Sequence, residues 1–306
     1  MGKIAFVFSG QGAQYSGMGK TLYEKGGSAE KLYNEAEEIR PGTMNQSFAG
    51  TDEELKLTVN TQPCLYLVDL CAALSLNDNG IYADGVAGFS LGEIAALAYA
   101  GAYSHSDGFK IVTSRGKFMS DASVGYEAGM AAVLKLDATT VTELAEGFEN
   151  LYAVNYNCPG QTVVSGTKEA VDAFVEKAKE AGGRAVPLAV SGAFHSPFMS
   201  EASDKFSAEL GSYNITKPEL PVYANLTAKP YGDDVIDTLA KQMKSPVKWQ
   251  ETIENMIADG YTDFIEVGAG KTLSGLIKKI SKEVNVYSVE DAASLEQTVQ
   301  AVKNNA

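Results

Sequence analysis

Histidine and cysteine are both scarce in this 306-residue sequence, which has two histidines and three cysteines. The cysteines, Cys64, Cys71 and Cys158, have no metal-ligand spacing and are too few for a disulfide framework. The histidines, His105 and His195, do not suffice for a histidine-rich zinc or iron site. We therefore expect no metal and no redox cofactor. The cysteine content is typical of a protein of the reducing cytoplasm.

Positive charge is also in deficit, because 25 Lys and Arg residues face 39 Asp and Glu residues and the net charge is −14. Such a chain repels nucleic-acid phosphates, so we expect no nucleic-acid partner. No apolar run is long enough to span a bilayer, and the apolar stretch at residues 4–8 is too short for a signal peptide. We therefore expect no membrane partner. The length allows one large domain, with or without a smaller insertion.

Strand and helix signals at both ends of the chain predict an α/β domain. Residues 4–8 form a buried strand before a glycine-rich turn, and residues 60–76 form a helix with Pro63 in its first turn. Other predicted elements are a strand at 86–89, helices at 91–100, 200–210 and 234–258, a strand at 264–267, and a helix at 273–279. The polar C-terminus is expected to be frayed.

The stretch GFSLGE, residues 88–93, contains the pattern Gly-x-Ser-x-Gly around Ser90. The pattern alone does not separate a catalytic nucleophile from a structural serine in a glycine turn. Its position between a predicted strand and a predicted helix favours a nucleophile elbow of the α/β-hydrolase kind. A serine hydroxyl also needs a base. His105 lies in a polar loop and is expected at the surface, whereas His195 lies where two predicted domains meet, so we favour His195.

A different pattern occupies residues 125–195. Its strands and helices follow the order β-α-β-β-α-β of a ferredoxin-like unit, at residues 129–136, 139–148, 151–156, 161–165, 168–181 and 184–190. We therefore predict an α/β fold in which a large hydrolase-like domain, residues 1–124 and 196–306, carries an inserted ferredoxin-like subdomain, residues 125–195.

Two glycine-containing stretches come close to nucleotide-binding motifs. Gly10-Gln11-Gly12 follows a strand, but Tyr15 replaces the third glycine of a dinucleotide fingerprint. Residues 270–272 are similar to the end of a phosphate-binding loop, but Ile265 stands where its first glycine belongs. Neither stretch predicts a nucleotide cofactor.

Eight short blocks follow one another along the chain: FSGQGAQ (residues 8–14), TQP (61–63), GFSLGE (88–93), SRGKFM (114–119), NYNCPGQ (155–161), GAFHSP (192–197), SPVKW (245–249) and EVGAGKTLSGL (266–276). Together they resemble malonyl-CoA:acyl carrier protein transacylases, in the same order and over nearly the whole chain. The length is similar to that of the free-standing enzyme of type II fatty acid synthesis.

The resemblance implies a role for each matching residue. Ser90 would attack the thioester of malonyl-CoA while His195 takes its proton, and the backbone N–H groups of Gln11 and Leu91 would form the oxyanion hole. The residue whose backbone carbonyl holds the His195 ring matches Gln242, not Gln250. Phe89 departs from the family, in which a histidine commonly precedes the nucleophile.

Substrate contacts are also implied by the resemblance. Arg115 matches the arginine that pairs with the malonyl carboxylate; its alternative is an ordinary surface arginine. Phe194 matches a bulky residue of malonyl-selective relatives, and a large ring there would hinder an added methyl group. Gln62, Asn155 and Asn157 are expected to line the cleft, although local turn and cap hydrogen bonding explains them as well.

The expected reaction is ping-pong transfer to the phosphopantetheine thiol of acyl carrier protein, by a monomer. A local basic patch is needed to bind that acidic partner, and the candidates are Lys271, Lys278, Lys279 and Arg184. Two rival hypotheses remain open: a serine esterase or thioesterase with the same Ser–His pair, and a scaffold in which Ser90 is structural. A cation at Arg115 argues against an esterase of neutral esters.

Overall fold

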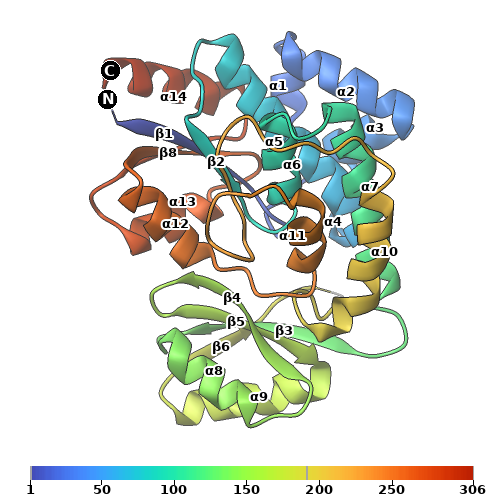
Figure 1. Cartoon of the computed structure of the whole chain (residues 1–306), viewed down its shortest axis with the longest axis vertical. Coiled ribbons are helices and arrows are strands. Elements are labelled where there is room, and N and C mark those ends of the chain that lie inside the picture. The colour runs from blue at the N-terminus through green and yellow to red at the C-terminus, as the bar shows by residue number, and fades with distance from the viewer. Residues whose placement is uncertain (1, 191, 306) are drawn as a thin grey trace.

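The computed structural model describes residues 2–190 and 192–305 and contains two separate sheets (Figure 1). The first is parallel, with the strand order β7-β2-β1-β8-β9. Its strands are β1 (Lys3–Phe8), β2 (Gly85–Gly88), β7 (Val222–Tyr223), β8 (Tyr261–Val267) and β9 (Asn285–Val289). The second is antiparallel, with the order β4-β5-β3-β6. Its strands are β3 (Ala128–Leu134), β4 (Leu151–Cys158), β5 (Gln161–Thr167) and β6 (Arg184–Pro187).

Strand β1 lies at the centre of the parallel sheet and is buried from Ile4 onward. Because successive side chains of a strand point to opposite faces, Phe6 and Phe8 pack with one group of helices, and Ala5 and Val7 with another. Helices α5 (Thr58–Asp78), α6 (Gly92–Tyr99) and α7 (His105–Asp121) cover the first face, and α12 (Trp249–Ala258) and α13 (Thr272–Ile280) cover the second. Such two-sided burial is what a parallel sheet requires.

The longest helix beside the parallel sheet is α5, with 21 residues. Helix α5 is buried on nearly all sides, which its apolar composition requires, and it begins at Thr58, so that Pro63 lies inside it and not in its first turn as predicted. The remaining helices around the parallel sheet are α1 (Lys20–Glu24), α2 (Ser28–Ile39), α3 (Thr43–Ala49), α4 (Asp52–Lys56), the 3-10 helix η1 (Pro197–Met199), α10 (Ser200–Leu210), α11 (Val235–Gln242) and α14 (Ala292–Asn304).

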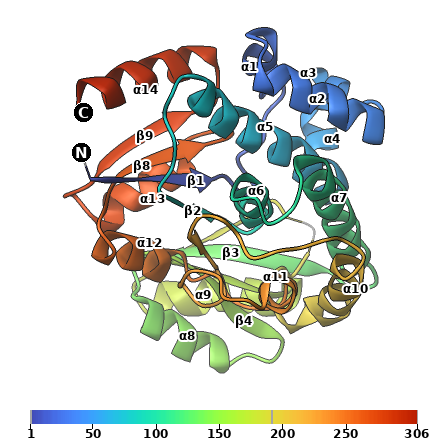
Figure 2. The same ribbon diagram turned by 45° about the horizontal axis from the view of Figure 1, so that its top comes forward.

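The antiparallel sheet carries α8 (Ala138–Glu146) and α9 (Lys168–Glu180) on its outer face, away from the parallel sheet (Figures 1 and 2). The order of these elements is the one predicted for residues 125–195. Ala131 and Val133 of β3 pack against the two helices, while Met130 and Ala132 face the other way and line a cleft. Strand β4 is also hydrogen-bonded to the chain just before α12, because the Val247 N–H donates to the Val154 carbonyl at 2.7 Å.

Three further predictions about secondary structure were wrong. The C-terminal region is not frayed, because β9 is followed by α14, where Asp291 and Ser294 form a capping box and Leu295 and Val302 are buried. Residues 234–258 form two helices, α11 and α12, and not one. His105 is not in a loop but begins α7, where burial lowers the pKa of its imidazole.

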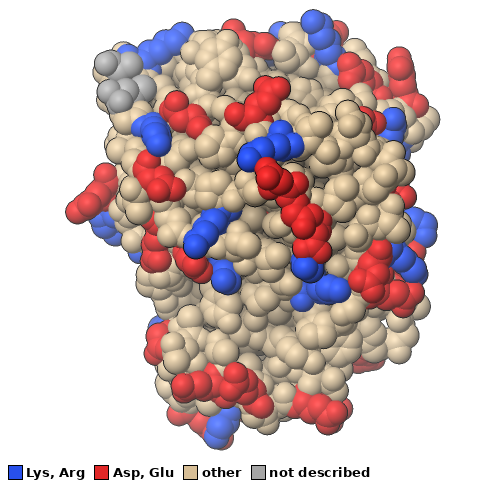
Figure 3. Space-filling model, viewed as in Figure 1, with Lys and Arg blue, Asp and Glu red and all other residues tan. Residues whose placement is uncertain are grey.

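Charged side chains of both signs are interspersed on the face seen in Figure 3, so neither sign covers that face. Within residues 2–190 and 192–305, no helix combines the length and the apolar character needed to cross a membrane.

Candidate active site

Ser90 stands on the sharp turn between β2 and α6, in a left-handed backbone conformation with φ of 54°. The turn is so tight that a Cβ added to Gly88 would lie 2.0 Å from the backbone carbon of Gly92. Only glycine fits there, which explains the first glycine of the motif. The predicted strand–turn–helix setting of the serine is therefore confirmed.

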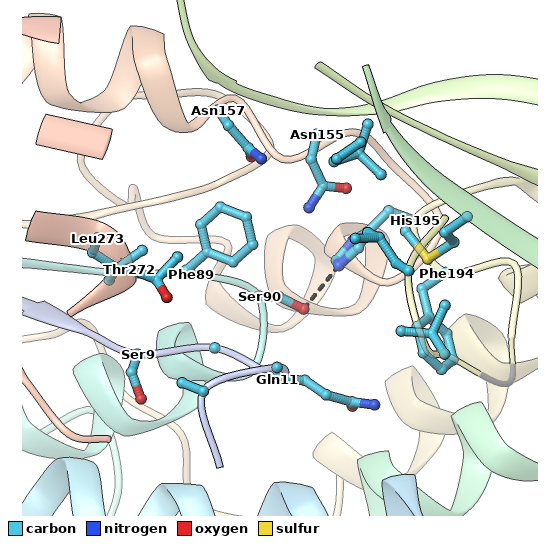
Figure 4. Close-up of a pocket in the computed structure, with 18 of the residues that line it drawn as sticks. Ser9, Gln11, Phe89, Ser90, Asn155, Asn157, Phe194, His195, Thr272 and Leu273 are labelled. Atoms are coloured by element: carbon cyan, nitrogen blue, oxygen red, sulfur yellow. Dashed lines mark hydrogen bonds between the residues drawn. The ribbon is translucent and has the colours of Figure 1, made fainter. Parts of the chain in front are cut away.

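His195 meets Ser90 from the other side of the cleft (Figure 4). Its Nε2 atom lies 2.8 Å from the Ser90 Oγ, and its Nδ1 atom lies 3.0 Å from the backbone carbonyl of Gln242. Burial, reinforced by the charge of Arg115, lowers the pKa of His195 to about 4. The ring is thus neutral at pH 7. Because Nδ1–H donates to the carbonyl, the lone pair of Nε2 faces the serine hydroxyl.

Arg115 extends from α7 to the same serine and is fully buried. Its Nη2 donates to the Ser90 Oγ at 3.2 Å and to the Gln242 Oε1 at 2.8 Å, and its Nη1 donates to the Gln62 Oε1 at 2.9 Å. Burial lowers the pKa of Arg115 to about 10, which still leaves it charged at neutral pH. All of these partners are uncharged, so the site holds a buried cation whose contacts among the described residues include no carboxylate.

The cleft beside Ser90 has a volume of about 230 Å³ and lies between the two sheets. It brings together most of the residues predicted for the site: Gln11, Gln62, Asn155, Asn157, Phe194 and His195. Asn155 and Asn157 extend into it from β4, and Figure 4 shows both side chains across from Ser90. Both are more than nine-tenths buried, and their Oδ1 atoms have no hydrogen-bond partner within the described part of the chain.

The loop after β1 passes close to the turn that carries Ser90. A Cβ added to Gly10 would lie 2.7 Å from the Phe89 carbonyl oxygen. The backbone N–H groups of Gln11 and Leu91 have no hydrogen-bond acceptor in residues 2–190 and 192–305. Phe89 itself lines the cleft and packs edge-to-face on Trp249, with 5.5 Å between the ring centroids.

A set of polar residues behind Ser90 was not predicted from the sequence. The Asn225 Oδ1 accepts from the Ser90 N–H at 2.8 Å, and the Asn225 N–H donates to Glu93 at 2.9 Å. Glu93 also accepts from the Tyr231 hydroxyl and, at 3.2 Å, from the Gln242 amide. A carboxylate within the apolar run of α6 is a signal that could have singled out Glu93. No comparable signal marks Asn225 or Tyr231.

His105 does not line this cleft, and its carbonyl accepts from the Tyr66 hydroxyl at 2.8 Å. Of the two histidines, only His195 contacts Ser90. In the described ranges there is no cluster of three or more His, Cys, Asp or Glu side chains that could hold a metal ion.

Residues 5–304 match the family model described as an acyl transferase domain. The malonyl CoA-acyl carrier protein transacylase of Bacillus subtilis is 40% identical over 311 residues, which cover 99% of this chain and 98% of that protein. The chain belongs to this transacylase family.

Solved structures agree with that assignment. The malonyl CoA-acyl carrier protein transacylase from Clostridium perfringens superposes with a TM-score of 0.95 at 37% identity, covering 99% of this chain and 98% of that one. A malonyl-transacylase in complex with a type II PKS acyl-carrier protein superposes with a TM-score of 0.93 at 32% identity, covering 98% of this chain and 99% of that one.

Proposed function

We propose that this chain transfers the malonyl group of malonyl-CoA to the phosphopantetheine thiol of acyl carrier protein, through an ester on Ser90, and so supplies fatty acid chain elongation. The proposal rests on the contacts that the Ser90 hydroxyl makes with His195 and Arg115. The Ser90 Oγ lies 2.8 Å from the His195 Nε2 and 3.2 Å from the Arg115 Nη2. A base and a carboxylate-binding cation therefore meet at the nucleophile. Family membership supports the same reading.

In the first half-reaction His195 takes the Ser90 proton as the Oγ attacks the thioester carbonyl. The N–H groups of Gln11 and Leu91 stabilise the oxyanion, an effect worth about a hundredfold or more in rate per donor. Collapse of the intermediate breaks the carbon–sulfur bond, and His195 returns the proton to the leaving CoA thiolate. The Gln242 carbonyl holds the imidazole in the tautomer that this step needs.

In the second half-reaction the carrier thiol gives its proton to His195 and its sulfur attacks the malonyl ester. The carbon–oxygen bond of the ester breaks, and His195 protonates the departing Ser90 oxygen. The free enzyme is restored with one thioester exchanged for another, which is the ping-pong scheme.

Arg115 accounts for the choice of acyl group. A buried guanidinium that contacts only neutral groups gains a charge-assisted hydrogen bond when a malonyl carboxylate arrives. A neutral ester has no carboxylate to pair with that charge, so Arg115 argues against an esterase of neutral esters.

The remaining cleft residues have proposed roles in positioning. Asn155 and Asn157 offer buried amide groups to the two amides of the pantetheine arm, since their Oδ1 atoms have no partner in the described chain. Phe194, only 6% exposed and in the cleft wall, restricts the space next to the acyl group. Gln62 accepts from Arg115 and helps to aim it.

For the carrier protein we propose a basic surface at one end of the small sheet. The Lys279 Nζ lies 3.5 Å from the Gln161 Oε1, and Gln161 lines the cleft. Gln161 and Arg184 both pair with Leu134 in register, so Arg184 is two strand spacings, about 10 Å, from Gln161. Lys278 is the neighbour of Lys279 on α13. Lys271 fits this surface less well, because it lies 3.8 Å from Glu290. Rising salt should raise the KM for carrier protein; an unchanged KM would exclude this surface.

The finer description of the fold is also a proposal. Residues 1–124 and 196–306 form an α/β-hydrolase-like domain, and residues 125–195 form a ferredoxin-like subdomain; residues 1, 191 and 306 of these ranges lie outside the described residues. The turn at Ser90 supports the first part, and the strand order β4-β5-β3-β6 under two helices supports the second. A cytoplasmic location, a monomeric state and independence from cofactors remain predictions.

One experiment separates the proposed activity from its rivals. The protein is mixed with malonyl-CoA labelled in the malonyl group, quenched, digested and mapped, with Ser90→Ala as the control. Label on the Ser90 peptide that passes to added phosphopantetheinylated carrier protein supports the transacylase. Rapid release of free malonate would identify a hydrolase, and the absence of labelling would identify a scaffold.

A further inference from the structure

Glu93 is fully buried directly behind the nucleophile. Its side chain does not line the cleft, and its contact with Ser90 is through the backbone, where the Glu93 N–H donates to the Ser90 carbonyl at 3.2 Å. Its two oxygens accept from three donors. These are the backbone N–H of Asn225 at 2.9 Å, the amide of Gln242 at 3.2 Å and the hydroxyl of Tyr231. A carboxylate offers only acceptors, so all three donors find a partner in one group.

Two of these donors belong to residues that set the geometry of Ser90. Asn225 accepts from the Ser90 N–H at 2.8 Å and donates to the Gly88 carbonyl at 2.6 Å. Gln242 donates to the Ser90 carbonyl at 2.7 Å. The backbone on both sides of the nucleophile is therefore held by side chains that Glu93 holds in turn.

Gln242 also connects Glu93 to the base and to the cation. The Gln242 Nε2 has two acceptors, Glu93 and the Ser90 carbonyl, which directs Oε1 toward the Arg115 Nη2 at 2.8 Å. A reversed amide would place two donors, from Gln242 and Arg115, against each other. The backbone carbonyl of Gln242 holds the His195 ring.

We propose that Glu93 is a positioning residue for malonyl transfer, which orients Asn225 and Gln242 so that Ser90, His195 and Arg115 meet in one arrangement. This inference rests on the proposed function of the site. The groups that face Glu93 are Tyr231, Asn225, Gln242 and the more distant Arg115 and Tyr103.

The test compares Glu93→Ala, which removes the acceptors, with Glu93→Gln, whose carbonyl oxygen can replace the oxygen that bonds Asn225 and Gln242. The Tyr231 hydroxyl can then turn to accept from the new amide. Glu254→Ala is the matched control, because Glu254 accepts from Gln250 at 2.8 Å on the exposed side of α12. Circular dichroism and thermal unfolding establish that each variant is folded at the assay temperature.

We expect Glu93→Ala to lower kcat for malonyl transfer about 10- to 100-fold, because small displacements of reacting groups have effects of that size. The KM for malonyl-CoA should stay within about threefold, since Arg115 and Gln62 are retained, and Glu93→Gln should restore kcat to within about threefold of wild type. Glu254→Ala should leave both parameters unchanged. Wild-type kcat in folded Glu93→Ala, or a kcat in Glu93→Gln as low as in Glu93→Ala, would overturn the proposal.

If Glu93→Ala does not fold, Tyr231→Phe takes its place, because it removes one of the three donors and fills almost the same volume. A several-fold loss of kcat is then expected, and an unchanged kcat would overturn the proposal. Failure of the proposed function is a distinct result, since it would appear as wild-type protein that takes no label from malonyl-CoA on Ser90.

Discussion

Ser90 and His195 both have a left-handed backbone, with φ of 54° and 59°, and their side chains meet with 2.8 Å between Oγ and Nε2. This conformation costs a residue other than glycine on the order of 1–3 kcal/mol. The surroundings hold it in both cases: the Ser90 N–H donates to Asn225, and the His195 N–H donates to the Met243 carbonyl at 3.1 Å. The proposed nucleophile and the proposed base are thus placed by strained backbone that the rest of the fold maintains.

The pH dependence of acylation should report the buried state of His195. The proposed base must be neutral, and burial lowers the pKa of His195 to about 4, so protonation of His195 should lower activity only as the pH drops through about 4. An exposed histidine would lose activity near pH 6.5. The measurement is kcat/KM for malonyl-CoA between pH 4 and pH 8.

Glu93 also titrates within the measured pH range, because burial raises its pKa to about 7. Its protonation can therefore add a second change to the profile near neutral pH. The profile should therefore be measured in Glu93→Gln as well, where this carboxyl no longer titrates. The acid limb that remains in Glu93→Gln should lie near pH 4. A remaining limb near pH 6.5 would show that His195 is not desolvated as described.

Replacing Arg115 by alanine should change the selectivity for the acyl group. A hydrogen bond to a charged group contributes about 1.5–3 kcal/mol, so kcat/KM for malonyl-CoA should fall about 10- to 100-fold relative to that for acetyl-CoA. Acetyl-CoA has no carboxylate to lose this contact. Lys117→Ala is the control, because Lys117 is an exposed cation on the same helix, paired with Asp121 at 2.6 Å. An unchanged malonyl-to-acetyl ratio in Arg115→Ala would remove Arg115 from the acyl pocket.

Phe194→Ser should relax discrimination against methylmalonyl-CoA. The ring is 6% exposed in the cleft wall, and steric rejection of one methyl group is worth about 1–3 kcal/mol. The ratio of kcat/KM for malonyl-CoA to that for methylmalonyl-CoA should fall about tenfold or more, while Phe194→Leu should retain more of it. Equal ratios in wild type and Phe194→Ser would show that Phe194 does not discriminate against the methyl group. Because the ring is buried, Phe194→Ser should also be destabilised by several kcal/mol, so the assay temperature must lie below its Tm.

Two glycine-to-alanine changes, one in the tight turn at Ser90 and one in α13, should have opposite effects on stability. Gly88→Ala places a Cβ 2.0 Å from backbone, so we expect a loss of about 3 kcal/mol or more in the free energy of unfolding, or no folded protein. Gly275, within α13, has nothing within 4 Å of an added Cβ, so Gly275→Ala should stabilise by about 0.5–1 kcal/mol. Thermal and denaturant unfolding measure both. A Gly88→Ala protein as stable as wild type would contradict the geometry of the turn.

Local signals in the sequence were enough to predict the turn at Ser90, the order of the elements in residues 125–195 and the choice of His195. Each rests on neighbouring residues: a strand before a helix, a turn between two strands, or the scarcity of histidine. Resemblance to the family added Gln11, Leu91, Arg115 and Gln242, whose places around Ser90 no local pattern indicates.

The contacts between the residues behind Ser90 could not be predicted in this way. Glu93 is separated by 132 residues from Asn225 and by 138 residues from Tyr231, so their contacts exist only once β2, α6 and the chain after β7 are packed together. At the C-terminus polar composition was misleading. Leu295 and Val302, seven residues apart, give α14 a buried side although most of its residues are polar.

In the proposed reaction Ser90 carries the malonyl group and passes it to a thiol in preference to water. Single-turnover decay of the malonyl-Ser90 enzyme, followed by quenched-flow mass spectrometry with and without phosphopantetheinylated carrier protein, tests it most directly. We expect an ester on Ser90 that is stable in buffer and decays at least about a hundredfold faster when the carrier thiol is present, with malonyl-carrier as the product. Decay at the same rate with and without the thiol, yielding free malonate, would contradict it.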